Sequence, residues 1–542
     1  MIWPSLACEA MRQLPQEQER LNLQSRLDAM KSQAERNRLG QFATPTSLAR
    51  DILQFGIALL GVENRIRFLD PAIGTGSFFS ALLQTVPESR IDAAKGFELD
   101  AHYGGPARDF WRGTTLNLEI ADFTQIKPPR EEAHRFNLLI CNPPYVRHHH
   151  IVNGEKSRLH GETKAACGIN ISGLAGLYCY FLGLSHAWMQ KGGIAGWLIP
   201  SEFMDVNYGK AVKRYLLNNV TLLRIHRFDP QEVQFGDALV SSAVVWFRND
   251  LPSASHNVDF TFGGSLLRPK ISRAVPISVL HGAAKWTSLP ISDEQEAAVC
   301  HRLADLFKIK RGVATGGNKF FIVTKEQIET GGLPREAFRP ILPSPRHVAV
   351  NEIEADKDGV PVLDHQLFLL DCRVSEEEVI ARYPNLWSYL EKCKHILSER
   401  YLCRSRKVWY FQEERPPAPI LCTYIGRSDA KNGRPFRFIL NHSKATAANV
   451  YLLLYPKSVL ARAIDRDQSI LRRVWEALNN LSPKAILREG RVYGGGLHKL
   501  EPNELGNVDA TPIIKAIPEL KDLPKSIQPS LFDLEAVQRN VS

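Results

Sequence analysis

The chain has 542 residues, of which 44% are hydrophobic and 23% are charged, the composition of an ordinary globular protein with room for several domains. Its net charge of +10 favours a polyanionic partner, because each phosphate that a protein neutralises releases a condensed counterion. The nine cysteines never stand at C-x-x-C spacing, so neither a zinc ribbon nor a redox pair is indicated. Their odd number and scatter predict reduced thiols in a cytoplasmic protein.

The start of the chain predicts a helical extension over residues 1–37. Leu, Gln, Glu and Arg dominate residues 16–38 with apolar residues at near-helical spacing, and Gly40 is a common stop for a helix. No basic segment precedes an apolar core here, so no signal peptide is predicted. Residues 171–188 are the most apolar stretch, but glycine, serine and histidine interrupt it. We expect a buried helix there and no membrane span.

Short apolar runs alternate with helical patterns from residue 38 to residue 250. This alternation predicts βαβ units and therefore an α/β fold, with a doubly wound, mostly parallel sheet and helices on both faces. Beyond it we expect a linker or irregular β segment at 251–285, a second domain of mixed α+β type at 286–524, and a lightly packed tail at 525–542. The expected strands are residues 66–70, 94–97, 137–141, 193–199, 222–228 and 240–247.

A glycine turn follows the first expected strand. Gly74 and Gly76 allow a ligand to approach the backbone closely at the carboxyl end of the strand, where open α/β sheets bind their ligands. Position 79 is Phe, so the third glycine of a dinucleotide fingerprint is missing, and there is no Gly-Lys-Ser/Thr of a P-loop. Asp70 ends the strand instead. A carboxylate there would repel a pyrophosphate but can pair with the ammonium group of S-adenosylmethionine.

Two further acidic positions fit the same cofactor. Glu98 ends the next strand about 20 residues after Gly76, where a ribose-binding carboxylate lies in such sheets. A helix cap or a solvated acid is the alternative interpretation. Asp122 and Phe123 would place an acid near the adenine amino group of the cofactor and a ring against the adenine face.

The tetrapeptide Asn142-Pro143-Pro144-Tyr145 follows the strand at 137–141 and can be read as a turn alone. Its chemistry indicates more. An adenine N6 lone pair is delocalised and reacts only if acceptors hold its hydrogens out of the ring plane. The side chain of Asn142 and the backbone carbonyl of Pro143 can supply those acceptors, and the prolines hold them in place. Tyr145 offers a flat face to a base that has left the duplex.

These segments together resemble the gamma class of adenine-N6 DNA methyltransferases of restriction–modification systems. The resemblance implies a Rossmann-like catalytic domain over residues 38–250 that binds S-adenosyl-L-methionine, and a target-recognition domain over 286–524. Residues 40–45 resemble the segment that binds the methionine end of the cofactor. The implied cofactor-binding residues are Phe42, Thr44, Pro45, Asp70, Pro71, Ala72, Gly74, Gly76, Glu98, Asp122 and Phe123.

The same resemblance implies how the substrate is held. An aromatic residue in the segment after the strand at 193–199 packs on the other face of the flipped adenine, with Tyr208 the first choice and Phe203 the second. Arg147 and Lys319 are expected DNA contacts. The implied partners are double-stranded DNA and a separate cognate restriction endonuclease. We expect a monomer, no membrane association and no metal ligands.

Other readings of the sequence stay open. Asparagine ahead of Pro-Pro-Tyr favours adenine over the N4 of cytosine. The same tetrapeptide also serves methylases of RNA bases and of a glutamine amide in proteins, but those enzymes are usually shorter and lack a large basic second domain. A DNA-binding modification subunit that needs a partner is a further alternative. Only about 37 residues precede the first motif, which is too few for a fused nuclease domain.

Overall fold

The structure is a computed structural model. The predicted tail at 525–542 lies outside the residues that it describes, and so does the start of the strand expected at 240–247. The described residues are 7–61, 63–229, 241–283, 285–287, 289, 301–427, 434–493 and 496–520.

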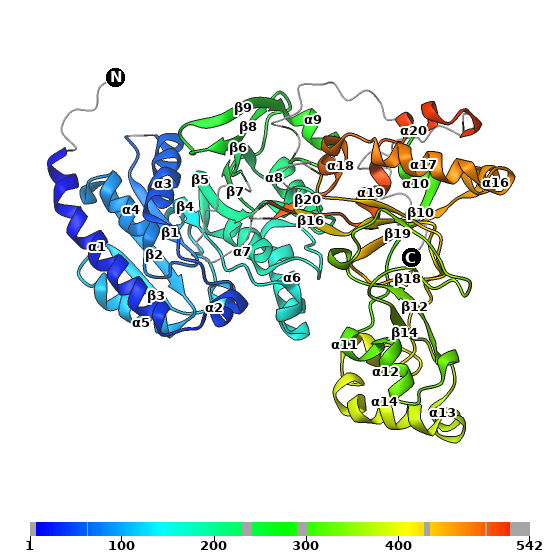
Figure 1. Ribbon diagram of the computed structural model, residues 1–542. Coiled ribbons are helices and arrows are strands. Elements are labelled where there is room, and N and C mark those ends of the chain that lie inside the picture. Colours follow the sequence, from blue (N-terminus) through cyan, green and yellow to red (C-terminus); the bar gives the residue numbers. More distant parts are fainter. Residues whose placement is uncertain are drawn as a thin grey trace. The chain divides into compact units, whose positions relative to one another are not determined.

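The described chain divides into two compact units (Figure 1). The first holds the described residues up to 289, and the second holds nearly all of those from 301 onward. No helix in these described ranges is both long enough and apolar enough to cross a membrane.

A nine-stranded sheet forms the centre of the first unit, in the order β3-β2-β1-β4-β5-β7-β6-β8-β9. The first five strands in this order run parallel, and β7 runs antiparallel to both of its neighbours. Each of the six expected strands is present. The bounds are β1 Ile66–Asp70, β2 Ile91–Glu98, β3 Leu116–Ile120, β4 Phe136–Cys141, β5 Met189–Pro200, β6 Thr221–Arg227, β7 Ser242–Arg248, β8 Asn257–Gly264 and β9 Pro269–Pro276.

Helices cover both faces of this sheet, as predicted. Alternate side chains of a strand point to opposite faces. Phe68 and Leu138 therefore pack in one core cluster with α3 and α4, whereas Leu69 and Leu139 pack in another with α7 and α8. The helix bounds in this unit are α1 Ala7–Ala29, α2 Gln33–Leu39, α3 Thr46–Leu60, α4 Ser77–Thr85, α5 Ala101–Phe110, α6 Asn153–Cys167, α7 Leu177–Ser185, α8 Gly209–Asn218 and α9 Ile277–Gly282.

The strand order reverses between β1 and β4. β2 and β3 lie on one side of β1, whereas β4 and β5 lie on the other. Chain connections leave such a switch point in opposite directions, which opens a crevice at the carboxyl ends of the strands where ligands bind. The topology therefore directs attention to the residues that follow β1, β2 and β4.

Two predicted helices differ from those observed. The helix expected over residues 16–38 is broken into α1 and α2, because the side chain of Ser32 caps the new start by accepting a hydrogen bond from the Glu35 amide. The stop is where it was expected, at Gly40 in the left-handed conformation. In the apolar stretch 171–188, only α7 and the 3-10 turn after it are helical, and α7 is buried as predicted.

Of the two structures predicted for residues 251–285, the β segment is present and the linker is contradicted over most of the described residues. This segment forms β8, β9 and α9, and β8 pairs in parallel with β6. Val258 and Phe260 alternate inward along β8 and are buried. β9 is mostly exposed at the edge of the sheet, so it carries no apolar alternation that the sequence could reveal.

The second unit is of mixed α+β type, as predicted. It contains a five-stranded sheet β10-β19-β15-β17-β13, a four-stranded sheet β11-β14-β12-β18 and a three-stranded sheet β16-β21-β20. The strand bounds are β10 Phe307–Arg311, β11 Ile322–Thr324, β12 Phe338–Leu342, β13 Glu352–Ile353, β14 Leu367–Leu370, β15 Ile420–Thr423, β16 Ile425–Arg427, β17 Phe438–Asn441, β18 Thr446–Ala447, β19 Tyr451–Pro456, β20 Arg491–Tyr493 and β21 Leu497–Lys499.

The two larger sheets of this unit each pack against their own helices in a separate hydrophobic core. Helices α11 to α15 pack on the four-stranded sheet, whereas α16 to α20 pack with the five-stranded sheet (Figure 1). The helix bounds are α10 Leu303–Leu306, α11 Asn318–Phe321, α12 Lys325–Thr330, α13 Glu376–Arg382, α14 Pro384–Leu397, α15 Tyr401–Arg404, α16 Ser458–Arg466, α17 Ser469–Asn479, α18 Pro483–Glu489, α19 Pro502–Asn507 and α20 Thr511–Ala516.

Candidate active site

Asp70 ends β1 in a fully enclosed position, with 1% of its surface exposed. The backbone amide of Ala72 donates to its carboxylate over 3.1 Å. Burial raises the pKa of Asp70 to about 8, and the nearby charge of Glu98 adds to this rise. Cys141, at the end of β4, lies beside Asp70, and burial raises the pKa of its thiol. Cys141 is thus a core residue, and the ends of β1 and β4 meet here.

The glycine turn after β1 needs both of its glycines. Gly74 and Gly76 have positive φ angles of 55° and 90°, which favour glycine. A Cβ atom at Gly76 would lie 2.4 Å from the indole nitrogen of Trp111, whereas one at Gly74 would meet nothing within 4 Å. Gly74 therefore borders open space. The sequence did not single out Trp111, whose indole N–H donates to the Thr75 carbonyl over 3.0 Å.

Glu98, at the end of β2, faces the glycine turn. It accepts hydrogen bonds from the backbone amides of Gly74, at 3.0 Å, and Asp100, at 2.9 Å. Burial raises the pKa of Glu98 despite these bonds. The next residue, Leu99, is 70% exposed, and sequence reasoning missed it. Single exposed apolar side chains are common, but this one directly follows a half-buried acid at the carboxyl end of β2.

The segment at 40–45 lies against the tetrapeptide that begins at Asn142, although about 100 residues separate them in the chain. The Asn142 side-chain amide donates to the Phe42 carbonyl over 3.0 Å and to Thr44 Oγ1 over 3.1 Å. The ring centroids of Phe42 and Tyr145 are 5.9 Å apart. A Cβ atom at Gly40 would lie 2.3 Å from the Tyr145 backbone nitrogen. The structure therefore joins the two predicted segments into one site.

Asn142 presents its side-chain oxygen in an unusual state. The side-chain nitrogen of Asn142 donates both of its hydrogen bonds to the segment at 40–45. These bonds fix the orientation of the side-chain amide. Oδ1 is buried and has no hydrogen-bond partner in the described part of the chain. Burying a polar atom without a partner costs about 1–3 kcal/mol. Such an atom therefore marks a place where a ligand donor fits.

The neighbouring residues of the tetrapeptide are held firmly. Pro143 is buried and Pro144 is half-buried. The Tyr145 hydroxyl donates to the Leu198 carbonyl of β5 over 3.1 Å, and burial raises the pKa of Tyr145. This bond ties the loop after β4 to the neighbouring strand.

Two aromatic residues of the predicted set lie in the core. Phe123 is 2% exposed, and its ring packs against those of Phe97, Phe181 and Trp188 at 5.4–5.5 Å. Phe203 is completely buried. The predictions that Phe123 lies on the cofactor adenine and that Phe203 can replace Tyr208 on the target base are wrong, because neither ring presents a face to a ligand.

The remaining predicted residues have mixed surroundings. The Asp122 carboxylate accepts hydrogen bonds from Thr124 and from the Gln125 side chain. The Tyr208 hydroxyl donates to Glu202 Oε1 over 2.6 Å, which leaves its half-buried ring anchored at one end. Among the others, Pro71 is buried, Ala72 is half-buried, and Pro45, Arg147 and Lys319 are exposed, Lys319 in α11 of the second unit.

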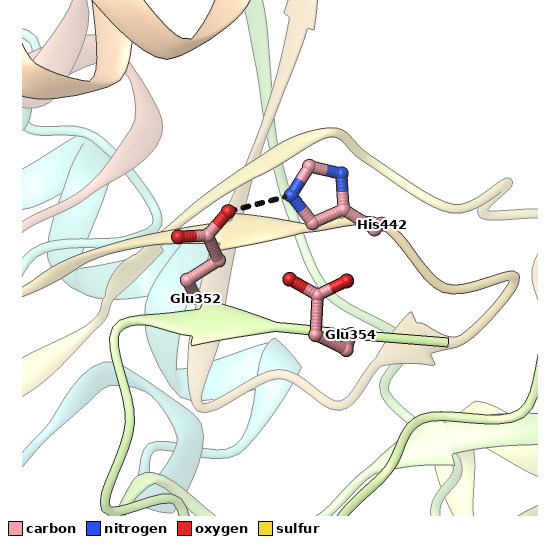
Figure 2. Close-up of side chains that lie close together, drawn as sticks. All are labelled: Glu352, Glu354 and His442. Atoms are coloured by element: carbon pink, nitrogen blue, oxygen red, sulfur yellow. Dashed lines mark hydrogen bonds and ion pairs between the residues drawn. The ribbon is translucent and has the colours of Figure 1, made fainter. Parts of the chain in front are cut away.

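The second unit carries a cluster of side chains whose spacing would suit a metal ion, formed by Glu352, Glu354 and His442 (Figure 2). His442 Nε2 lies 2.9 Å from a carboxylate oxygen of Glu352. Arg472 also pairs with Glu352. This arginine already supplies the positive charge, and Glu354 and His442 are exposed, so the cluster is accounted for as a surface ion-pair network.

Comparison with known families accounts for most of the chain. Residues 102–234, which include Asn142, match the family described as Eco57I restriction-modification methylase. Residues 284–533 match the C-terminal domain of Type II methyltransferase M.Eco57I. This chain belongs to the Type II restriction–modification methyltransferases.

Full-length relatives agree with this assignment. The methyltransferase is 28% identical to Type II methyltransferase M.XamI of Xanthomonas campestris pv. amaranthicola, over 86% of this chain and 84% of the relative. It is 27% identical to Type II methyltransferase M.AccI of Acinetobacter calcoaceticus, over 87% and 85%. A solved structure of the Type IIL restriction-modification enzyme MmeI in complex with DNA has the same fold, with a TM-score of 0.54 and 13% identity over 95% of this chain and 81% of that one.

Proposed function

We propose that this methyltransferase transfers a methyl group from S-adenosylmethionine to the N6 amino group of an adenine that has left the DNA duplex. The buried, unpartnered Oδ1 of Asn142 carries this proposal. A carbonyl oxygen accepts a hydrogen bond and cannot donate one. An exocyclic amino group supplies the donor that this oxygen needs, and N6 of adenine is such a group.

The residues around the glycine turn fit S-adenosylmethionine. Asp70 is a buried carboxylate and Glu98 is a half-buried one, and among the described residues no lysine or arginine side chain is hydrogen-bonded to either of them. The ammonium group of the methionine moiety complements Asp70, and the ribose hydroxyls can donate to Glu98. The open space at Gly74 admits the ligand between them. When bound, S-adenosylmethionine supplies an electrophilic methyl group.

The protein's part in the reaction is to hold and orient the base. Asn142 Oδ1 and the backbone carbonyl of Pro143 accept the two N6 hydrogens, which turns the nitrogen lone pair out of the ring plane. The amide nitrogen of Asn142 stays bonded to the segment at 40–45, so the acceptor cannot rotate away. No enzyme nucleophile is needed, which agrees with the burial and raised pKa of Cys141.

Two side chains complete the contacts that we propose for the two adenines. Leu99 replaces Phe123 as the apolar face beside the cofactor adenine, because it is exposed next to Glu98. Tyr208 remains the candidate for the outer face of the target adenine. Its hydroxyl is fixed on Glu202, so the ring is oriented before a base arrives.

We assign DNA as the substrate and the second unit as the part that selects the sequence. The net charge of +10 supports a nucleic-acid partner, and MmeI, which has the same fold, was solved in complex with DNA. Arg147, directly after the tetrapeptide, and Lys319 are exposed and available for phosphates. We propose a monomer that modifies the site of a separate restriction endonuclease.

One labelling experiment tests the reaction as a whole. The purified protein is incubated with genomic DNA of mixed sequence and methyl-labelled S-adenosylmethionine, and the digested nucleosides are identified by mass spectrometry. Label in N6-methyladenine is the expected result. Label in N4-methylcytosine would overturn the choice of base. Label only in RNA or in a protein glutamine, or none at all, would overturn DNA as the substrate of this chain alone.

A further inference from the structure

The outer side of the glycine turn is held by a charged network from α1. Arg20 is 1% exposed, and its guanidinium forms a two-pronged ion pair with Glu17, one helical turn earlier, in which both N–O distances are 2.7 Å. The remaining Nη1 donates to Thr75 Oγ1 over 3.0 Å. Thr75 stands between Gly74 and Gly76, so this arginine reaches the middle of the turn.

Glu17 extends the same network to the other segment of the proposed cofactor site. Its carboxylate accepts from Ser80 of α4, at 2.5 Å, and from Thr46, the first residue of α3. Thr46 directly follows the segment at 40–45. Burial alone would raise the pKa of Glu17, but the hydrogen bonds from Arg20, Ser80 and Thr46 outweigh it and hold the pKa below its usual value. One charged pair therefore contacts the glycine turn and the residue that directly follows the segment at 40–45.

The hydroxyl of Thr75 makes two hydrogen bonds to α1, one as acceptor and one as donor. Oγ1 accepts from Arg20 and donates to Gln24 over 2.5 Å. Its backbone carbonyl accepts from Trp111. The turn itself consists of two glycines in the left-handed region, which have little conformational preference of their own. The side chain of Thr75 is thus the only one in Gly74-Thr75-Gly76 that can anchor the turn.

Stability alone is a poor reason for such a pair. Desolvating two charges offsets most of their attraction, and apolar replacements of similar volume are often neutral or stabilising. What an apolar pair cannot do is direct bonds to Thr75, Ser80 and Thr46 together. We therefore infer that Glu17 and Arg20 are positioning residues, which set the glycine turn and the segment at 40–45 at the spacing that S-adenosylmethionine requires. This inference rests on the proposed function.

The sharpest test replaces the hydroxyl of Thr75 and leaves its shape unchanged. We expect Thr75→Val to raise the Kd for S-adenosylmethionine about tenfold, the effect of losing hydrogen bonds to a charged partner. Thr75→Ser keeps the hydroxyl and should bind within about threefold of the wild type. The measurement is isothermal titration calorimetry of the full chain without DNA, so it does not depend on turnover. Equal binding by the Val and Ser variants would overturn the inference.

A double-mutant cycle tests whether Arg20 acts through Thr75. Arg20→Met should also raise the Kd about tenfold, and Arg20→Met/Thr75→Val should be little weaker than either single variant, because both remove the same link. An additive, roughly hundredfold loss would contradict this coupling. Arg26→Met makes the same chemical change at an exposed position of α1 and should bind as the wild type does.

The outcomes of these binding experiments distinguish a failure of this inference from a failure of the proposed function. A wild-type protein that binds no S-adenosylmethionine would refute the cofactor assignment itself. A wild type that binds, together with a Thr75→Val variant that binds equally well, would refute only the positioning role. If Arg20→Met fails to fold, the comparison of Thr75→Val with Thr75→Ser still tests the positioning role. At saturating cofactor, kcat of the Thr75→Val variant should stay within about threefold of the wild type, because the acceptors at Asn142 are untouched.

Discussion

The two sides of the glycine turn hold their polar side chains in opposite electrostatic states. Toward the carboxyl ends of the strands, burial raises the pKa values of Asp70 and Glu98, and Asn142 Oδ1 has no partner among the described residues. Toward α1, burial would raise the pKa of Glu17, but the hydrogen bonds from Arg20, Ser80 and Thr46 outweigh this effect and lower the pKa.

This difference distinguishes a binding surface from a scaffold. The side toward α1 is complete in the protein alone, since Glu17, Arg20 and Thr75 satisfy one another. On the side toward the strand ends, no described lysine or arginine is hydrogen-bonded to Asp70 or Glu98, and no described donor reaches Asn142 Oδ1. A methionine ammonium group and an adenine amino group would supply the missing cation and donor. Buried carboxylates with raised pKa values are thus informative only when their partners are counted as well.

The largest effect should come from the unpartnered acceptor. Asn142→Ala should lower kcat by about 10³-fold, the loss seen when a preorganised group at the reacting atom is removed. Binding of S-adenosylmethionine, measured by calorimetry, should change far less. Asn219→Ala is the matched control, because Asn219 donates to the Cys167 carbonyl away from the site. Wild-type turnover by Asn142→Ala would refute the acceptor role.

Asp70 should make cofactor binding depend on pH. Burial raises its pKa from the ordinary value of 3.8 to about 8 in the folded protein, so this carboxyl destabilises the ligand-free fold increasingly as pH rises between these values. Pairing with an ammonium group requires the ionised form. The affinity for S-adenosylmethionine should therefore fall by up to about tenfold for each pH unit below 8.

Asp70→Asn separates this effect from other titrations. The variant cannot ionise, so its affinity should be about thirtyfold weaker than that of the wild type at pH 8 and should approach it near pH 6.5. Calorimetry between pH 6 and 8 measures both curves. Parallel curves for the two proteins would show that Asp70 does not face the cation.

A smaller effect is expected where the segment at 40–45 meets the tetrapeptide. Gly40→Ala places a Cβ atom 2.3 Å from the Tyr145 nitrogen at a residue with φ of 66°, so the two segments must separate. We expect about tenfold weaker cofactor binding and a loss of unfolding free energy of about 2 kcal/mol. Gly105→Ala, inside α5, where a Cβ atom meets nothing within 4 Å, is the control in calorimetry and denaturant unfolding. It should leave cofactor binding unchanged and raise the unfolding free energy by about 0.5–1 kcal/mol, because alanine favours a helix over glycine.

The smallest effect should come from Leu99. Because this side chain is 70% exposed, Leu99→Ala should leave unfolding free energy within about 0.5 kcal/mol of the wild type. It should still weaken S-adenosylmethionine binding about threefold, since an apolar face on the cofactor is lost. Val152→Ala, at another exposed apolar residue, should affect neither quantity. An unchanged affinity in Leu99→Ala would remove this residue from the proposed site.

The sequence by itself determined six of the nine strands of the sheet, and its motifs. The strand that ends in Asp70 has the predicted bounds, and the glycine turn and the Asn142 tetrapeptide follow strands that lie next to each other. Local rules suffice for these features, because apolar runs of strand length and glycine or proline turns are encoded by neighbouring residues.

Only the tertiary structure decided which aromatic and charged residues face the site. Phe123 has the residue type of a stacking ring, but its neighbours Phe97, Phe181 and Trp188 come from distant parts of the chain and enclose it. The same holds for β8 and β9, which pattern alone left as a linker or an irregular β segment. It holds too for Glu17 and Arg20, which are buried and paired although no local pattern indicates it. Burial and pairing are set by segments far apart in sequence, so a local pattern can name a residue's chemistry but not its surroundings.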